Sequence, residues 1–172
     1  MTLTGSDYLL RLSALAVSFV GWSAIVVTLR RALGAELSAL HVYFVRFFIE
    51  GGLGVAAFGL FPGELSFTGL TEITIWRLSS AAAGLMFSVY LIFLFRRRRR
   101  VTIGPTGLST PIAFAISVLA TVALWLNATA WAFPPGAAAY LLALTWLLVV
   151  GGWVFVQNLE LFLGVTPARE RS

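Results

Sequence analysis

The chain has 172 residues, of which 59% are hydrophobic and 11% are charged, and its formal net charge is +5. A soluble domain carries about 25% charged residues, so this chain lacks the polar side chains needed to cover a water-facing surface. The composition therefore indicates an integral membrane protein. Because the chain has no cysteine, disulfides, thiolate metal sites and iron–sulfur clusters are excluded. The absence of lysine excludes Schiff-base chemistry and the P-loop of ATPases.

Histidine and aspartate each occur once, as His41 and Asp7. These counts leave no histidine pair for a haem and no aspartate-rich metal motif, and no further metal ligands surround His41 in the sequence. We therefore expect no cofactor, no metal and no enzymatic activity. His41 is expected to be a polar anchor at the membrane interface, and a pH-dependent switch is the alternative.

Several apolar segments are long enough to cross a bilayer as helices, which takes about 20 residues. None shows the strict alternation of a barrel strand, and backbone in lipid must satisfy its own hydrogen bonds. The sequence therefore predicts an all-α fold, a polytopic transmembrane helix bundle that forms a single domain over 1–172. The five predicted spans cover about 9–29, 39–61, 73–95, 111–131 and 136–156.

Turn-forming residues separate these spans. Pro62 and Gly63 are predicted to end the second helix. Thr110 and Pro111 are typical of an N-cap followed by proline at the first helical position. The connection Phe-Pro-Pro-Gly at 133–136 is very short, so the fourth and fifth helices are predicted to be antiparallel neighbours.

The placement of arginine predicts the orientation, because cytoplasmic loops are rich in basic residues. We expect the N-terminus outside and the C-terminus inside, in the plasma (inner) membrane of a prokaryote. A cleaved signal peptide is the alternative interpretation of the first span, and it fits poorly because Met1–Leu10 carries no basic residue. The predicted inside holds Arg30, Arg31, the arginine run after the third span, Arg169 and Arg171, whereas Asp7, Glu64 and Glu72 lie outside.

The second predicted span holds a charged pair. Arg46 and Glu50 are four residues apart on one helix face, which Tyr43 shares. Counting from the ends of the span places Glu50 near the bilayer midplane, where a charge costs about 2.5–3.5 kcal/mol and should face protein or water. One interpretation is an internal ion pair that fixes helix packing; the other is a proton or ion relay, or a counter-charge for a substrate.

Arg77 lies one turn into the third predicted span. Its side chain either extends to the outer headgroups or, if the third helix packs on the second, reaches toward Glu50. In the second case Tyr43, Arg46, Glu50 and Arg77 form an intramembrane polar cluster. Stripes of small residues, which favour helix packing, are predicted at Ser80, Ala81, Gly84 and Ser88, at Gly52, Ala56 and Gly59, and at Ala14, Ser18 and Gly21.

An arginine run directly follows the third span. We predict that it anchors the helix to anionic lipids at the cytoplasmic face, where each arginine contributes about 1 kcal/mol. No aromatic residues interleave it, so nucleic acid is not an expected partner. Arg11, near the start of the first span, is expected to extend toward the outer headgroups. The run consists of Arg96, Arg97, Arg98, Arg99 and Arg100.

Three stretches, Ala16–Arg30, Val45–Glu50 and Trp76–Ser80, together resemble small, uncharacterised polytopic membrane proteins of bacteria. The resemblance covers about the first half of the chain and implies no activity. It supports the expectation that the chain is complete and not a fragment of a transporter.

The expected function is that of an accessory, structural or assembly subunit of the membrane, which binds an unlike subunit or another copy along a small-residue helix face. The alternative is an oligomeric ion or proton conduit, or a small-solute transporter, that uses Arg46, Glu50 and Arg77. A membrane enzyme is disfavoured because the sequence offers no set of nucleophile and base.

Overall fold

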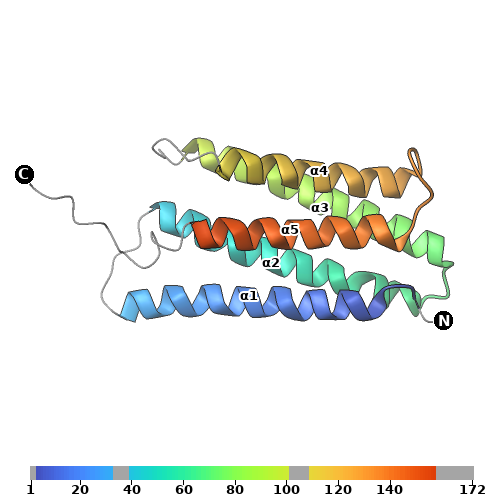
Figure 1. The fold of residues 1–172 in the computed structure, drawn as a ribbon, viewed down its shortest axis with the longest axis horizontal. Coiled ribbons are helices and arrows are strands. Elements are labelled where there is room, and N and C mark those ends of the chain that lie inside the picture. Colours follow the sequence, from blue (N-terminus) through green and yellow to red (C-terminus); the bar gives the residue numbers. More distant parts are fainter. Residues whose placement is uncertain (1–2, 33–38, 101–108, 158–172) are drawn as a thin grey trace, which may run out of the picture.

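The computed structural model describes residues 3–32, 39–100 and 109–157. These residues form helices that run side by side along one axis (Figure 1), and no strand occurs in the described ranges. The predicted all-α fold is confirmed. The helices are α1 (Ser6–Ala32), α2 (Ala39–Ser66), α3 (Glu72–Arg100), α4 (Ser109–Thr129) and α5 (Ala137–Gln157).

Each helix is long and apolar enough to cross a membrane. The apolar stretches range from 19 residues in α4 to 26 residues in α3. Large apolar side chains face outward along them: Trp22 is 66% exposed and Leu119 is 67% exposed. A bundle with an apolar exterior of this kind is stable in lipid, which solvates apolar side chains well. The structure therefore supports a multi-pass membrane protein.

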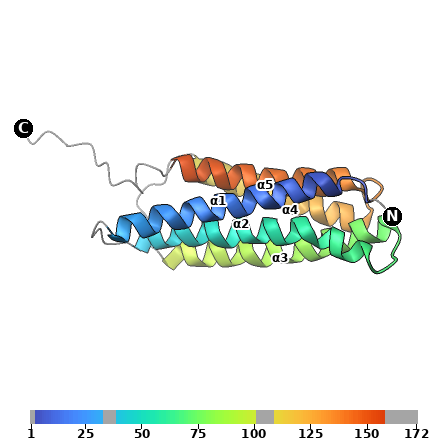
Figure 2. The same ribbon diagram turned by 90° about the horizontal axis from the view of Figure 1, so that it is seen from below.

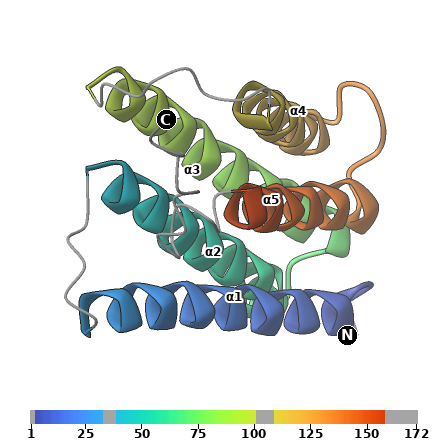
Figure 3. The same ribbon diagram turned by 60° about the vertical axis from the view of Figure 1, so that its left-hand side comes forward.

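Helix α5, the last in the sequence, occupies the centre of the bundle. It contacts each of the other helices, while α1 packs along α2 and α3 packs along α4 (Figure 3). Figure 2 shows α2 beside both α1 and α3. The predicted antiparallel packing of α4 and α5 is confirmed. We call the end of the bundle that holds Arg96 and Arg97 the arginine end; α1 and α5 also finish there, and α2 and α4 begin there.

Helix α2 continues through Pro62 to Ser66, so the predicted end of this helix at residue 61 is wrong. Proline has no N–H, and it therefore leaves the carbonyl of the residue four positions earlier without its helical donor. That carbonyl belongs to Phe58, and the hydroxyl of Tyr140 in α5 donates a hydrogen bond to it at 2.6 Å. Because a tertiary contact supplies the missing donor, the helix extends one turn further than its sequence predicts.

Small residues of α2 allow α1 to approach closely. A side chain at Gly52 would clash with Val20, and one at Gly59 would clash with Ser13. The Ser13 hydroxyl also donates to the carbonyl of Ala56 at 3.0 Å. The predicted stripe on α2 is therefore an interface.

The matching small-residue stripe predicted on the first span does not face α2. Ala14 and Ser18 are exposed. A side chain at position 21 would have no atom within 4 Å of its Cβ. The face of α1 that meets α2 instead contains Leu9, Ser13, Ala16 and Val20.

Candidate functional site

Glu50 of α2 forms an ion pair with Arg97 of α3. The distance between Arg97 Nη1 and Glu50 Oε2 is 3.5 Å, and the two side chains are 20% and 42% exposed respectively. The guanidinium of Arg97 also lies over the ring of Phe93, 5.5 Å from its centroid, which is a favourable cation–π distance. From the sequence, Arg97 was predicted to anchor lipid, and its acidic partner was not predicted.

Glu50 lies in the half of the apolar stretch of α2 that is nearer to the arginine end. The apolar stretch of α2 covers Val45–Ser66, so Glu50 is the fifth residue after its start (50 − 45 = 5), about 8 Å along a helix. Arg97 is the last residue of the apolar stretch of α3. The apolar stretch of α2 starts and ends later in the chain than the predicted span 39–61, and the midplane position of Glu50 stays a prediction.

Arg46, one turn before Glu50 in α2, is exposed and forms no ion pair with Glu50; in the described part of the chain, Glu50 pairs with Arg97 instead. Tyr43 is half-buried and lines an apolar cavity. Arg46 therefore does not pair with Glu50 as expected, whereas Tyr43 lies at the arginine end with Glu50.

Arg77 lies near the opposite end of α3. Its Nε donates to the carbonyl of Ala128 in α4 at 3.1 Å. Twenty residues separate it from Arg97 (97 − 77 = 20), about 30 Å along a helix, so the structure does not bring Arg77 to Glu50. Since the last carbonyls of a helix have no helical donor, Arg77 caps the end of α4.

The small stripe of α3 faces α4 and not α2. A side chain at Gly84 would contact the ring of Trp125 at 3.3 Å, and Trp125 Nε1 donates to the Ser88 hydroxyl at 3.1 Å. The conditional packing of the third helix on the second through this stripe is therefore wrong. Hydropathy does not distinguish packing of α3 on α4 from packing of α3 on α2, because both α2 and α4 present small residues.

Asn127 of α4 is a buried polar residue to which the sequence analysis gave no role. Its Nδ2 donates to Ser80 Oγ at 2.7 Å and to the carbonyl of Gly136 at 3.1 Å. Its Oδ1 accepts from the Gly136 N–H at 3.0 Å. Asn127 thus fixes the α4–α5 connection and ties it to α3. The available signal was an amide within an apolar span, which needs partners in lipid.

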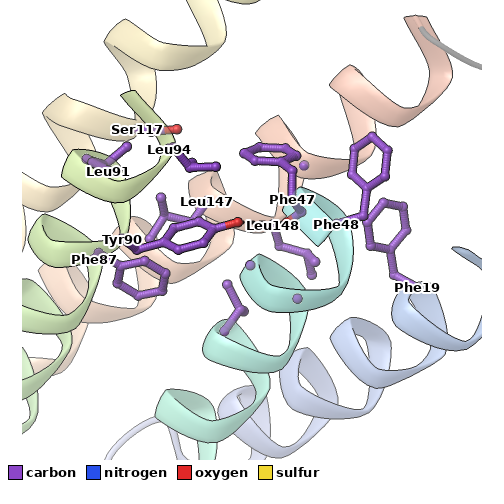
Figure 4. Close-up of a pocket in the computed structure, with 14 residues that line it drawn as sticks. Phe19, Phe47, Phe48, Phe87, Tyr90, Leu91, Leu94, Ser117, Leu147 and Leu148 are labelled. Carbon is purple, nitrogen blue, oxygen red and sulfur yellow. Dashed lines mark hydrogen bonds between the residues drawn. The ribbon is translucent and has the colours of Figure 1, made fainter. Parts of the chain in front are cut away.

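An apolar cavity of about 180 Å³ lies at the arginine end between α2, α3, α4 and α5; we call it the arginine-end cavity. A smaller pocket of about 40 Å³, the inner pocket, adjoins it and shares some of its walls. Figure 4 shows Tyr90, Phe47 and Ser117 around the inner pocket. The walls of the arginine-end cavity include Tyr43, Phe47, Leu94, Phe95, Ala113, Phe114, Ser117 and Val154.

Two of the hydroxyls at these walls bond to backbone. Ser117 Oγ donates to the carbonyl of Ala113 at 2.9 Å, and the Tyr90 hydroxyl donates to the carbonyl of Phe47 at 3.0 Å. A hydroxyl that already has a hydrogen-bond partner gains little binding energy from a polar ligand. Apolar walls, by contrast, favour a ligand that removes their surface from a polar environment. The arrangement therefore suits an apolar group.

Other residues singled out in the sequence lie partly or wholly outside the described part. His41, Arg98, Arg99 and Arg100 belong to helices, but their side chains are not among those described. Arg169 and Arg171 lie outside the described residues altogether. Arg96 is described and exposed. The lipid-anchor role of the arginine run stays a prediction.

Comparison with known proteins supplies no relative: no protein family, curated protein or solved structure matches the chain. The function must therefore be argued from the geometry of the chain itself.

Proposed function

We propose that this protein is a non-enzymatic accessory, structural or assembly subunit of a prokaryotic plasma membrane, and that it binds its partner through the outward face of α1. The proposed orientation places the N-terminus outside and the arginine end inside, where anionic lipids attract basic residues. The resemblance to small bacterial polytopic proteins agrees with this location. The observation that carries the proposal is the composition of the α1 face.

This face follows a regular spacing. Residues 7, 11, 14, 18 and 21 alternate in steps of four and three, and all are exposed. That spacing aligns side chains along one seam between packed helices. Ala14, Ser18 and Gly21 occupy its middle, and the Ser18 hydroxyl donates to its own helix at the Ala14 carbonyl. Small residues with satisfied polar groups let another helix approach closely in lipid.

Charge supports the same surface. Asp7 and Arg11 lie four residues apart at one end of the seam and are both exposed. In a parallel pair of α1 helices, the two charges would occupy adjacent layers, so Asp7 of one copy would lie beside Arg11 of the other. This complementarity favours a second copy of the chain, and an unlike subunit with the reverse charge order is the other possible partner.

Site-specific crosslinking tests the proposal. The chain has no native cysteine, so Gly21→Cys introduces a single reactive position in open space. We expect a crosslinked product of one discrete mass in native membranes, and that mass distinguishes a second copy from an unlike subunit. Gly152→Cys is the matched control, because position 152 in α5 is equally open. Equal crosslinking at both positions, or none at position 21, would contradict the proposal.

The alternative of an ion conduit or small-solute transporter depended on cooperation between Arg46, Glu50 and Arg77. Arg77 caps α4 near one end of the bundle, while Glu50 pairs with Arg97 near the other. Residues separated in this way do not form one relay. We therefore do not base a transport function on them.

A further inference from the structure

A further hollow lies outside the arginine-end cavity, on the surface between α3 and α4. This outer groove of about 410 Å³ is lined by Ile92, Arg96 and Val118, and it shares Leu91, Phe95 and Phe114 with the cavity. Ile92 is 55% exposed and Val118 is 37% exposed, so the outer groove faces the lipid side of the bundle. The rings of Phe95 and Phe114, with centroids 6.3 Å apart, stand between the outer groove and the cavity.

The arginine-end cavity is large enough for part of a hydrocarbon chain. An apolar cavity of about 150 Å³ binds benzene, and this cavity measures about 180 Å³ before the inner pocket is added. Ser117 lines both spaces, and its hydroxyl is bonded within its own helix. An acyl chain that passes the two phenylalanine rings would therefore meet a continuous apolar surface.

The entrance carries positive charge. Glu50 neutralises Arg97, whereas Arg96 lines the outer groove, is exposed, and has no acidic partner among the described residues. Pro111, in the first turn of α4, lines the cavity, and the N-terminus of a helix adds partial positive charge. An apolar cavity with a cationic entrance is complementary to an amphiphile with an anionic head.

We infer that the arginine-end cavity binds one acyl chain of an anionic phospholipid. The lipid enters from the bilayer between α3 and α4, the chain passes Phe95 and Phe114, and the phosphate stays outside at Arg96. Binding of this kind would fill the gap between α2 and α4, which α3 and α5 otherwise bridge. It differs from general attraction to a charged membrane surface because it requires the cavity.

Native mass spectrometry of the full chain tests the inference. The protein is reconstituted in equal amounts of phosphatidylglycerol and phosphatidylcholine with identical chains, then released in mild detergent. We expect the wild type to retain one phosphatidylglycerol. Ala113→Leu should lower retention of the lipid about tenfold, since it displaces roughly two methylene groups worth about 0.8 kcal/mol each. The matched control is Ala115→Leu, on the exposed side of the same helix.

The headgroup is tested separately. Arg96→Gln should reduce the preference for phosphatidylglycerol about fivefold, because one arginine near an anionic headgroup contributes about 1 kcal/mol. Arg46→Gln is the control, since Arg46 is also exposed near the arginine end but lines neither the cavity nor the outer groove.

Several results would overturn the inference. A wild type that retains no phospholipid, as a monomer or as a dimer, leaves the cavity to another occupant. Equal retention of both lipids would contradict a cationic entrance that selects an anionic headgroup. Unchanged retention in Ala113→Leu would show that the acyl chain does not occupy the cavity. If Ala113→Leu fails to fold, Ser117→Leu applies the same test, because the Ser117 hydroxyl bonds only within its own helix.

Discussion

At the scale of single residues, two charged side chains of this protein have partners that lie far from them in the sequence. Glu50 pairs with a residue of α3, and Arg77 caps the end of α4. In lipid each of these groups needs a partner or access to the boundary. The two groups meet this need with partners near opposite ends of the bundle.

The Glu50–Arg97 pair is expected to stabilise the protein modestly. Glu50→Gln leaves the Arg97 guanidinium without its anion, and the half-exposed position limits the loss to about 1 kcal/mol. Thermal unfolding of the purified variant in one detergent measures this loss. Arg46→Gln should leave the melting temperature unchanged, because Glu50 pairs with Arg97 and not with Arg46. A Glu50→Gln variant as stable as the wild type would show that the pair has no structural role.

Tyr140 is expected to matter because of Pro62. Tyr140→Phe leaves the buried carbonyl of Phe58 without a donor, which costs about 1–3 kcal/mol. In a Pro62→Ala background the helix regains its own N–H donor, so the same substitution should cost less. A double-mutant cycle of unfolding free energies measures this coupling.

Tyr90→Phe is the matched control for that experiment. The Tyr90 hydroxyl also donates to a carbonyl of α2, that of Phe47, but no proline removes the helical donor there. We expect a smaller loss, and the loss should not change in the Pro62→Ala background. Additive effects of Tyr140→Phe and Pro62→Ala would refute the proposed compensation.

At the scale of helices, the glycines of this protein differ in what surrounds them. Gly59→Ala introduces a methyl group that clashes with Ser13, and overpacking of this kind costs about 1–3 kcal/mol. Gly152→Ala introduces the same group in α5 with no atom within 4 Å of it, where alanine is the better helix former by up to about 1 kcal/mol. Unfolding measured in detergent should therefore show a loss of stability in the first variant and no loss in the second. A reversed order would mean that α1 and α2 pack differently.

At the scale of the whole molecule, the turn between α2 and α3 and the turn between α4 and α5 both lie at the end opposite the arginine end. Phe67 and Trp131, which lie in these turns, are 85% and 84% exposed. In the proposed orientation both face outward, so Phe67→Cys and Trp131→Cys should react with an impermeant maleimide in intact cells. Arg96→Cys should react only after lysis. If Arg96→Cys alone is labelled in intact cells, the orientation is the reverse of the proposed one.

The fold could be predicted from the sequence to the level of five helices because apolar length is a local property. Each helix needs only its own stretch of apolar residues to enter the bilayer, and those stretches are continuous in the chain. The end of α2 could not be predicted, since the donor that stabilises the helix beyond Pro62 belongs to Tyr140 in α5.

The candidate site was predicted only in part. Glu50 stood out as a charge in an apolar span, but its partner is 47 residues away (97 − 50 = 47) in an arginine run that suggests lipid contact. The arginine-end cavity has no sequence signal, because its lining comes from four helices and consists of ordinary apolar residues.

The sequence alone determined that this is an all-helical protein with five apolar helices, because the cost of placing backbone and charge in lipid is counted segment by segment. The tertiary structure decided which faces meet: α3 against α4, α2 against α1, and α5 at the centre. Lipid solvates every apolar face equally well, so hydropathy cannot rank the possible pairings. Close fit between small residues and the few polar contacts across helices select one arrangement, and both exist only once the helices are assembled.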